Sequence, residues 1–176
     1  MIGRVKATVE VKALPEDVFA AMVDLPSQDE WMLGTRLFAL SGEDVAEGVD
    51  RKEVRVPQVG SKIAALTGIA GMGVLDTMTV TVFDPPHRWE VRHTGSAFKG
   101  VGIFRVEPTP TGSRVTWVEE IDLPFGILGG LGFRLVKPLV YSGLVISLRH
   151  LARGVRTGIL PVTPRPTPIP GQETSP

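Results

Sequence analysis

The chain has 176 residues and carries 19 Lys and Arg against 19 Asp and Glu, so its formal net charge is zero. This length favours one domain, and the balanced charge argues against a general nucleic-acid binder, which needs a basic excess. The absence of cysteine excludes disulfides, thiolate metal sites and a cysteine nucleophile. The 20 glycines and 15 prolines exclude a mostly helical bundle and predict many turns.

The first part of the chain predicts a strand followed by two short helices. Apolar and polar residues alternate from Arg4 to Val11, which is typical of a strand. Pro15 and the two acidic residues after it suit the first turn of a helix, and a second short helix is expected from Pro26 to Met32. The N-terminus lacks the long apolar run of a signal peptide, so we expect a cytoplasmic protein.

The middle of the chain, from Gly34 to Leu123, has an apolar period of two and predicts strands joined by hairpin turns. The expected strands are Thr35–Leu40, Ser61–Thr67, Val74–Phe83, Arg88–His93, Phe98–Glu107 and Arg114–Leu123. Residues 42–59 are acidic and difficult to assign, and a further strand near Glu53–Val56 stays an open alternative.

A long helix is expected from Ile127 to Arg156, because apolar residues recur three or four positions apart. It carries two apolar rows, and Leu135 and Leu139 belong to the second row. Arg134 and Lys137 lie in the middle of its most apolar part and argue against a transmembrane span, since central charges are costly in a bilayer. Transient contact with a membrane stays an alternative.

The order of strand, two short helices, six strands and one long helix predicts an α+β domain at residues 2–158. A helix with two apolar rows has more apolar surface than a flat sheet needs, so we expect a curved sheet around it and an internal hydrophobic cavity. Residues 159–176 form a proline-rich tail, which we expect to be disordered. The alternative is that the tail is a docking segment for a partner protein.

Pairing the strands across their turns predicts which side chains face this cavity. The expected ligand-binding residues are Trp31, Met78, Val80, Trp89, Val91, Gly100, Gly102, Phe104, Trp117, Leu135 and Leu139. In the predicted register Gly102 lies between Trp89 and Glu119. Gly100 and Gly102 either leave open volume for a ligand or mark a bulge or the close approach of another group. Trp31 is alternatively a packing anchor.

Three ionisable residues fall on the same predicted face, namely Asp76, His93 and Glu119. A carboxylate in apolar surroundings is costly unless it is paired, so these are candidates for ligand contacts or proton transfer. His93 and Asp76 lie near one another in this register and could form a hydrogen bond. The alternatives are that His93 lies in water at the open end of the sheet and that Glu119 pairs with an arginine or is exposed by a bulge. Tyr141 is a fourth candidate, with the edge of the core as its alternative position.

The three histidines are too scattered for a zinc site, so no metal is predicted, and a site made of His93 with two carboxylates stays an open alternative. Gly71-Met-Gly73-Val-Leu-Asp76 departs from the dinucleotide-binding motif, because aspartate stands at the last glycine position. Phosphate-loop and Gly-x-Ser-x-Gly motifs are absent as well, and no cofactor is predicted.

Several motifs resemble the START/polyketide-cyclase (SRPBCC) superfamily over about residues 3–157. They are Val9–Phe19, Trp31, the Asp-Pro-Pro turn within Val80–Trp89, Gly112–Trp117 and Ser147–Leu151. The resemblance implies a helix-grip fold, in which a seven-stranded antiparallel sheet surrounds a C-terminal helix and a deep hydrophobic cavity. Relatives bind lipids, sterols, polyketides or hormones, and some cyclise aromatic polyketides. The superfamily has no universal catalytic motif, so the resemblance assigns no catalytic residue.

The sequence therefore predicts a carrier or sensor that binds a hydrophobic small molecule such as a lipid, a polyketide or an isoprenoid. A polyketide cyclase or dehydratase is the first alternative, with His93, Asp76, Glu119 or Tyr141 as acid or base. A regulatory interaction module is the second. The oligomeric state is not predicted.

Overall fold

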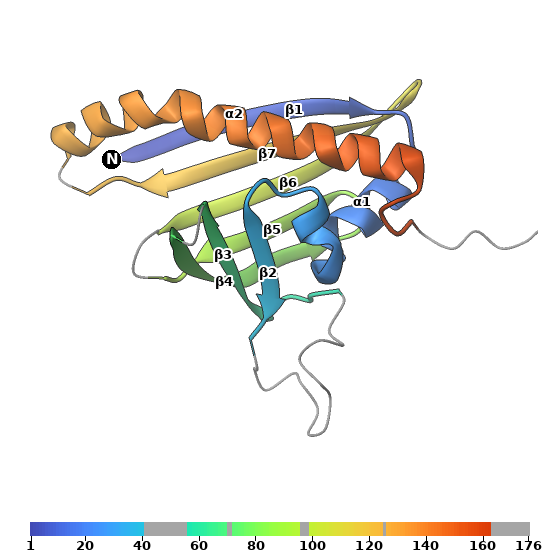
Figure 1. Ribbon diagram of the computed structural model, residues 1–176, viewed down its shortest axis with the longest axis horizontal. Coiled ribbons are helices and arrows are strands. Elements are labelled where there is room, and N and C mark those ends of the chain that lie inside the picture. Colours follow the sequence, from blue (N-terminus) through green and yellow to red (C-terminus); the bar gives the residue numbers. More distant parts are fainter. Residues whose placement is uncertain (41–55, 70–71, 96–98, 125, 163–176) are drawn as a thin grey trace, which may run out of the picture.

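A computed structural model describes residues 1–40, 56–69, 72–95, 99–124 and 126–162. One long helix crosses an antiparallel sheet of seven strands (Figure 1). The elements are β1 (Ile2–Val11), α1 (Pro15–Val23), the 3-10 helix η1 (Leu25–Glu30), β2 (Thr35–Ala39), β3 (Lys62–Ile69), β4 (Met72–Asp84), β5 (Arg88–His93), β6 (Gly100–Thr109), β7 (Gly112–Asp122) and α2 (Ile127–Thr157).

The strand order is β1-β7-β6-β5-β4-β3-β2, with every neighbouring pair antiparallel. This is the α+β helix-grip arrangement that the sequence predicted. Every expected strand is present, and the bounds of the fifth, Arg88–His93, are as predicted. Residues 53–55 of the strand considered near Glu53–Val56 and residues 163–176 of the proline-rich tail lie outside the described residues. Leu160, at the start of the predicted tail, is buried in the core.

The strand register departs from the prediction where β5 pairs with β6. Gly102 pairs with Glu119 of β7 as predicted. On its other side Gly102 pairs with Val91 of β5, whereas Trp89 was expected there. The shift is two residues, and side chains alternate with a period of two, so the residues of β5 and β6 keep their predicted faces. A bulge in β4 between Val80 and Val82 puts Phe83 opposite Trp89 and Val82 opposite Glu90, so strict alternation assigns Val82 to the wrong face.

Aromatic side chains form the centre of the core. Trp31 is 1% exposed, and its ring lies 6.5 Å from that of Phe104 and 6.1 Å from that of Trp117, edge-on to both. Trp89 stacks on Phe104 at 5.2 Å. Such pairs stabilise a core beyond their buried area. The wall of aromatic rings therefore joins the segment after η1 to strands β5, β6 and β7.

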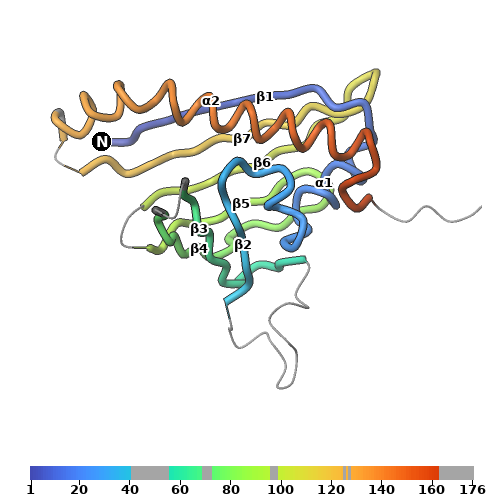
Figure 2. The backbone as a smooth tube through the Cα atoms, in the orientation of Figure 1, coloured from blue at the N-terminus to red at the C-terminus, as the bar shows by residue number. Residues whose placement is uncertain are grey.

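The two halves of α2 have different surroundings. The helix packs against β1, α1 and η1, and Figure 2 shows its first turns beside the N-terminus of the chain. In the C-terminal half, Leu148 and Leu151 are fully buried. In the N-terminal half, Leu135 is 84% exposed and Leu139 is 76% exposed. The expectation that Leu135 and Leu139 face the cavity is wrong, because the other apolar row, with Phe133 and Val140, turns toward the sheet.

The segment Leu128–Thr157 of α2 is long and apolar enough to cross a bilayer by length and composition alone, with a mean hydropathy of 1.4 in its most apolar window. Only 17% of that window is buried. The contacts of α2 with the sheet and with α1 nevertheless make it an element of this fold.

Candidate functional site

A pocket of about 340 Å³ lies between the inner face of the sheet, the segment after η1 and the middle of α2. Pockets of this size accept small organic ligands. We call it the central pocket. Its apolar walls include Met32, Leu37, Ile63, Ala65, Met78, Trp89, Val91, Phe104, Trp117, Ile121, Val140 and Leu144. Leu33 and Val74 also line it and are 51% and 42% exposed, so the pocket reaches the surface.

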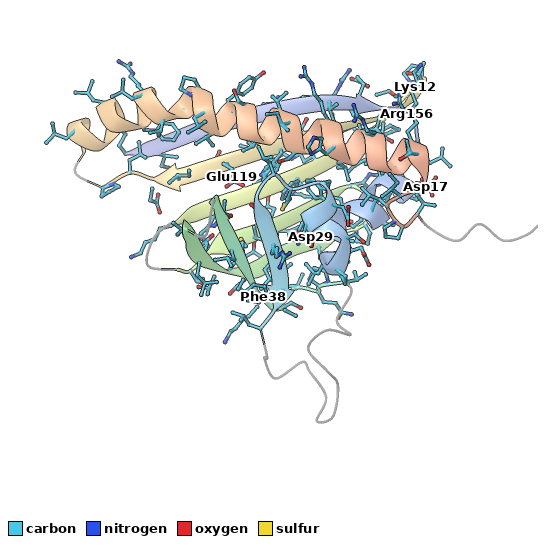
Figure 3. All side chains as sticks on the ribbon, viewed as in Figure 1. Lys12, Asp17, Asp29, Phe38, Glu119 and Arg156 are labelled. Atoms are coloured by element: carbon cyan, nitrogen blue, oxygen red, sulfur yellow. The ribbon has the colours of Figure 1, made fainter. Side chains whose placement is uncertain are left out.

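Three ionisable side chains meet at one wall of this pocket, and we call them the acid–histidine cluster. Nδ1 of His93 lies 2.5 Å from Oδ2 of Asp76, and Nε2 lies 3.2 Å from Oε2 of Glu119. The side chains of His93, Asp76 and Glu119 are 13%, 9% and 13% exposed, respectively. Nε1 of Trp117 donates a hydrogen bond to Oε1 of Glu119 at 2.6 Å. Figure 3 labels Glu119 between α2 and the strands.

Gly102 of β6 explains how side chains of β5 and β7 touch each other although β6 lies between these two strands. A Cβ atom on Gly102 would lie 3.1 Å from Oε1 of Glu119 and 3.1 Å from Cγ2 of Val91. Neighbouring strands lie about 4.8 Å apart, so a side chain between β5 and β7 would fill the space that His93 and Glu119 use. The absence of a side chain at Gly102 is therefore what makes the acid–histidine cluster possible.

Gly100 has a different reason to be glycine. Its φ is +147°, and a Cβ atom there would lie 2.0 Å from the backbone oxygen of Glu120. Neither Gly100 nor Gly102 lines the central pocket. The expectation that they leave open volume for a ligand is wrong, and the alternative of a close approach by another group is correct at both positions.

The electrostatics of the cluster favour the charged form of His93. Burial by itself lowers the pKa of this imidazole, but the hydrogen bonds and negative charges of Asp76 and Glu119 outweigh burial and raise the pKa from 6.5 to about 9. At neutral pH the imidazole is therefore protonated, and its two N–H groups donate to the two carboxylates. The alternative of a water-exposed His93 is wrong, and Glu119 pairs with His93 and Trp117 instead of an arginine.

Of the other residues predicted to bind a ligand, some line the central pocket and some are buried in the core. Met78, Trp89, Val91, Phe104 and Trp117 line the central pocket as expected. Trp31 and Val80 are buried in the core behind it, which is the packing role considered for Trp31.

Tyr141 does not line the central pocket. It is 48% exposed and borders a separate surface depression with Arg4, Lys6 and Lys137. The expectation that its hydroxyl faces the cavity is wrong, because at this position α2 turns its side chain away from the inner face of the sheet.

The sequence analysis missed three polar residues of the pocket. Oγ of Ser147 accepts a hydrogen bond from the backbone N–H of Leu33 at 3.0 Å, which ties α2 to the segment after η1. The hydroxyls of Thr35 and Thr67 lie 3.0 Å apart across β2 and β3. Ser147 carried a usable signal, since it lies beside Leu148 within a row of apolar residues.

No group of three His, Cys, Asp or Glu side chains suited to a metal ion occurs among the residues that the structure describes. A doubly protonated His93 has no lone pair for a metal ion, so this form of the acid–histidine cluster does not suit metal coordination. Within the cluster, Oδ1 of Asp76 is buried without a hydrogen-bond partner.

Residues 3–156 match the model of a family described as polyketide cyclase / dehydrase and lipid transport. The solved structures with a similar fold include TTHA0849 from Thermus thermophilus, with a TM-score of 0.69 and 19% identity, covering 89% of this chain and 99% of that one. They also include the Polyketide_cyc-like protein Cgl2372 from Corynebacterium glutamicum, with a TM-score of 0.57 and 16% identity, covering 89% and 93%. No curated protein sequence matches the chain.

Proposed function

The chain belongs to the polyketide cyclase/dehydrase and lipid transport family, and we propose that it binds a hydrophobic small molecule in the central pocket as a carrier or sensor. The ligand class is a lipid, a polyketide or an isoprenoid-like compound. The observation that carries the proposal is the composition of the pocket, whose walls are aliphatic and aromatic except at the acid–histidine cluster and three hydroxyls. Sites for small molecules typically combine such apolar walls with a few placed polar groups.

Two glycines of α2 provide a matched test of this proposal. Gly143 lines the central pocket, whereas Gly132 does not, and a Cβ atom at either position meets no other atom within 4 Å. Gly143→Phe therefore places a ring in the pocket, and Gly132→Phe makes the same change outside it.

Binding is measured with a fluorescent apolar probe, and native mass spectrometry detects a hydrophobic molecule that copurifies with the protein. Gly143→Phe is expected to weaken probe binding more than tenfold, and Gly132→Phe is expected to leave it unchanged. Equal binding by both variants, or no binding by the unmodified protein, would refute the proposal.

An acid–base enzyme is the second candidate, favoured by the buried pair of carboxylates around His93. With a pKa of about 9, His93 suits the role of an acid better than that of a base, since only about 1% of it is deprotonated at pH 7. In such an enzyme His93 would protonate an oxygen of a bound polyketide. Turnover of an aromatic polyketide precursor that His93→Gln abolishes while probe binding persists would favour the enzyme, and unchanged turnover would exclude this role.

A further inference from the structure

The charges around the central pocket have one prevailing sign. Its ionisable lining residues, among those described, are Asp76, His93 and Glu119, and neither lysine nor arginine lines it. Two carboxylates and one imidazolium give the acid–histidine cluster a formal charge of −1 at neutral pH. We propose that the central pocket selects amphiphiles whose head group is an uncharged or cationic hydrogen-bond donor, such as an alcohol or an amine, and rejects carboxylates. This inference rests on the ligand-binding function proposed above.

The hydrogen bonds within the cluster support the same choice. Both nitrogens of His93 are engaged with carboxylates, so no charged donor is free for an anionic head group. The other charged groups of the cluster are carboxylates, which accept hydrogen bonds from a hydroxyl or an ammonium group.

Neither a hydroxyl nor an ammonium group adds negative charge to the pocket, and both donate hydrogen bonds. A carboxylate ligand, by contrast, would bring a second net negative charge into surroundings of low dielectric constant, where like charges repel strongly.

The experiment compares dodecanol, dodecylamine and dodecanoate as competitors of the fluorescent probe at pH 7, each below its critical micelle concentration. Because the tails are the same, differences in affinity report the head group. Dodecanol and dodecylamine are expected to displace the probe at least tenfold more effectively than dodecanoate. Equal or stronger displacement by dodecanoate would overturn the inference while leaving the proposed function intact. Failure of all three ligands and of the probe would refute the proposed function and the inference together.

A matched pair of variants connects the selectivity with the cluster. Glu119→Gln removes one negative charge from the pocket with little change in shape. Glu120→Gln makes the same change one residue later, where the carboxylate faces away from the pocket and pairs with Arg4 at 3.3 Å. Glu119→Gln is expected to reduce the preference for dodecanol over dodecanoate severalfold, and Glu120→Gln is expected to preserve it. Equal selectivity in the two variants would contradict the inference. Asp76→Asn provides a second readout if Glu119→Gln does not fold.

A different observation carries a second proposal. Leu128, Leu131, Leu135 and Leu139 recur every three or four residues along one face of α2 and are 74%, 53%, 84% and 76% exposed. We call them the leucine stripe. The whole of α2 contains five basic residues, Arg134, Lys137, Arg149, Arg153 and Arg156, and no acidic one. We propose that the leucine stripe docks on the surface of an anionic lipid bilayer.

The charge of α2 favours an anionic bilayer over a second copy of the chain as the partner of the leucine stripe. Arg149 and Arg153 are exposed and follow Leu131 and Leu135 by 18 residues, so they continue the face of the leucine stripe. Two copies that met along this face would bring the arginines of both helices to it, with no acidic residue of α2 to balance them. An anionic bilayer accepts both the leucines and the arginines on this face. The position also fits ligand exchange, since Val140 and Gly143, which line the central pocket, follow directly after the stripe.

Cosedimentation with vesicles tests the docking surface. The protein is expected to bind phosphatidylcholine vesicles that contain phosphatidylglycerol, and to bind pure phosphatidylcholine vesicles at least tenfold more weakly. The double substitution Leu135→Ser/Leu139→Ser is expected to weaken binding at least tenfold. The control Leu66→Ser/Leu75→Ser, at residues 44% and 55% exposed on β3 and β4, is expected to leave it unchanged.

Three outcomes would overturn the proposal for the leucine stripe. These are no vesicle binding, equal loss in the stripe variant and its control, and a dimer in sedimentation velocity that the substitutions in the stripe disperse.

Discussion

Removal of the imidazolium from the acid–histidine cluster should change how the stability of the protein depends on pH. The residue to substitute is His93. Burial lowers the pKa of its imidazole, but Asp76 and Glu119 outweigh burial and raise the pKa from 6.5 to about 9. A group with a raised folded-state pKa stabilises the folded state fully below its unfolded pKa. That stabilisation is lost as the pH rises through the folded value. The relevant window is therefore from about pH 6.5 to about pH 9.

The magnitude follows from the size of the shift. Each pKa unit corresponds to about 1.4 kcal/mol, so His93 should contribute about 3 kcal/mol at pH 6 and almost none at pH 10. In His93→Gln this contribution is absent at every pH, and the two carboxylates face each other without a cation. The variant should therefore be less stable than the unmodified protein below pH 7, and the difference should shrink as the pH rises to 10.

The assay is urea unfolding at several values between pH 6 and pH 10, with the pKa of His93 followed independently by NMR of the imidazole. His150→Gln is the matched control, because His150 is exposed on α2; this variant should retain the pH dependence of the unmodified protein. A constant stability difference between the unmodified protein and His93→Gln across this range would refute the reasoning, as would an imidazole that titrates near pH 6.5.

Further predictions concern the other contacts described above. Gly102→Val should separate His93 from Glu119 across β6 and lower the pKa of His93, and an unchanged NMR titration would show that the glycine is not required. Trp31→Ala should lower the free energy of unfolding by about 3–5 kcal/mol, because it removes a buried ring from the aromatic wall; a loss below about 1 kcal/mol in urea would contradict that packing. Leu135→Ser should change stability by less than about 0.5 kcal/mol in thermal unfolding, since the side chain is 84% exposed.

The sheet was predictable because its signals are local. Alternation and turn residues define the strand Arg88–His93, and the same period places His93 on the inner face with Asp76 and Glu119. The error of two residues in the pairing of β5 with β6 did not disturb this result, since a shift by an even number keeps every side chain on its face. The family resemblance and the helix-grip fold were likewise accessible from the motifs.

The orientation of α2 could not be predicted from its own sequence. In its N-terminal half both rows consist of large apolar residues, so a spacing of three and four residues fits either row against the sheet. Only the packing on β1, α1 and η1 selects one row, and this leaves Leu135 and Leu139 in solvent.

What the sequence alone determined is the set of elements and, away from the bulge in β4, the side of the sheet on which the strand residues lie, because both follow from local backbone periodicity. What only the tertiary structure decided is which of those residues touch. Gly102 illustrates the difference, since its chain neighbours do not reveal that the missing side chain lets His93 meet Glu119 across β6. The contact depends on the pairing of three consecutive strands, and the register between β5 and β6 differs from the one that the turns alone suggest.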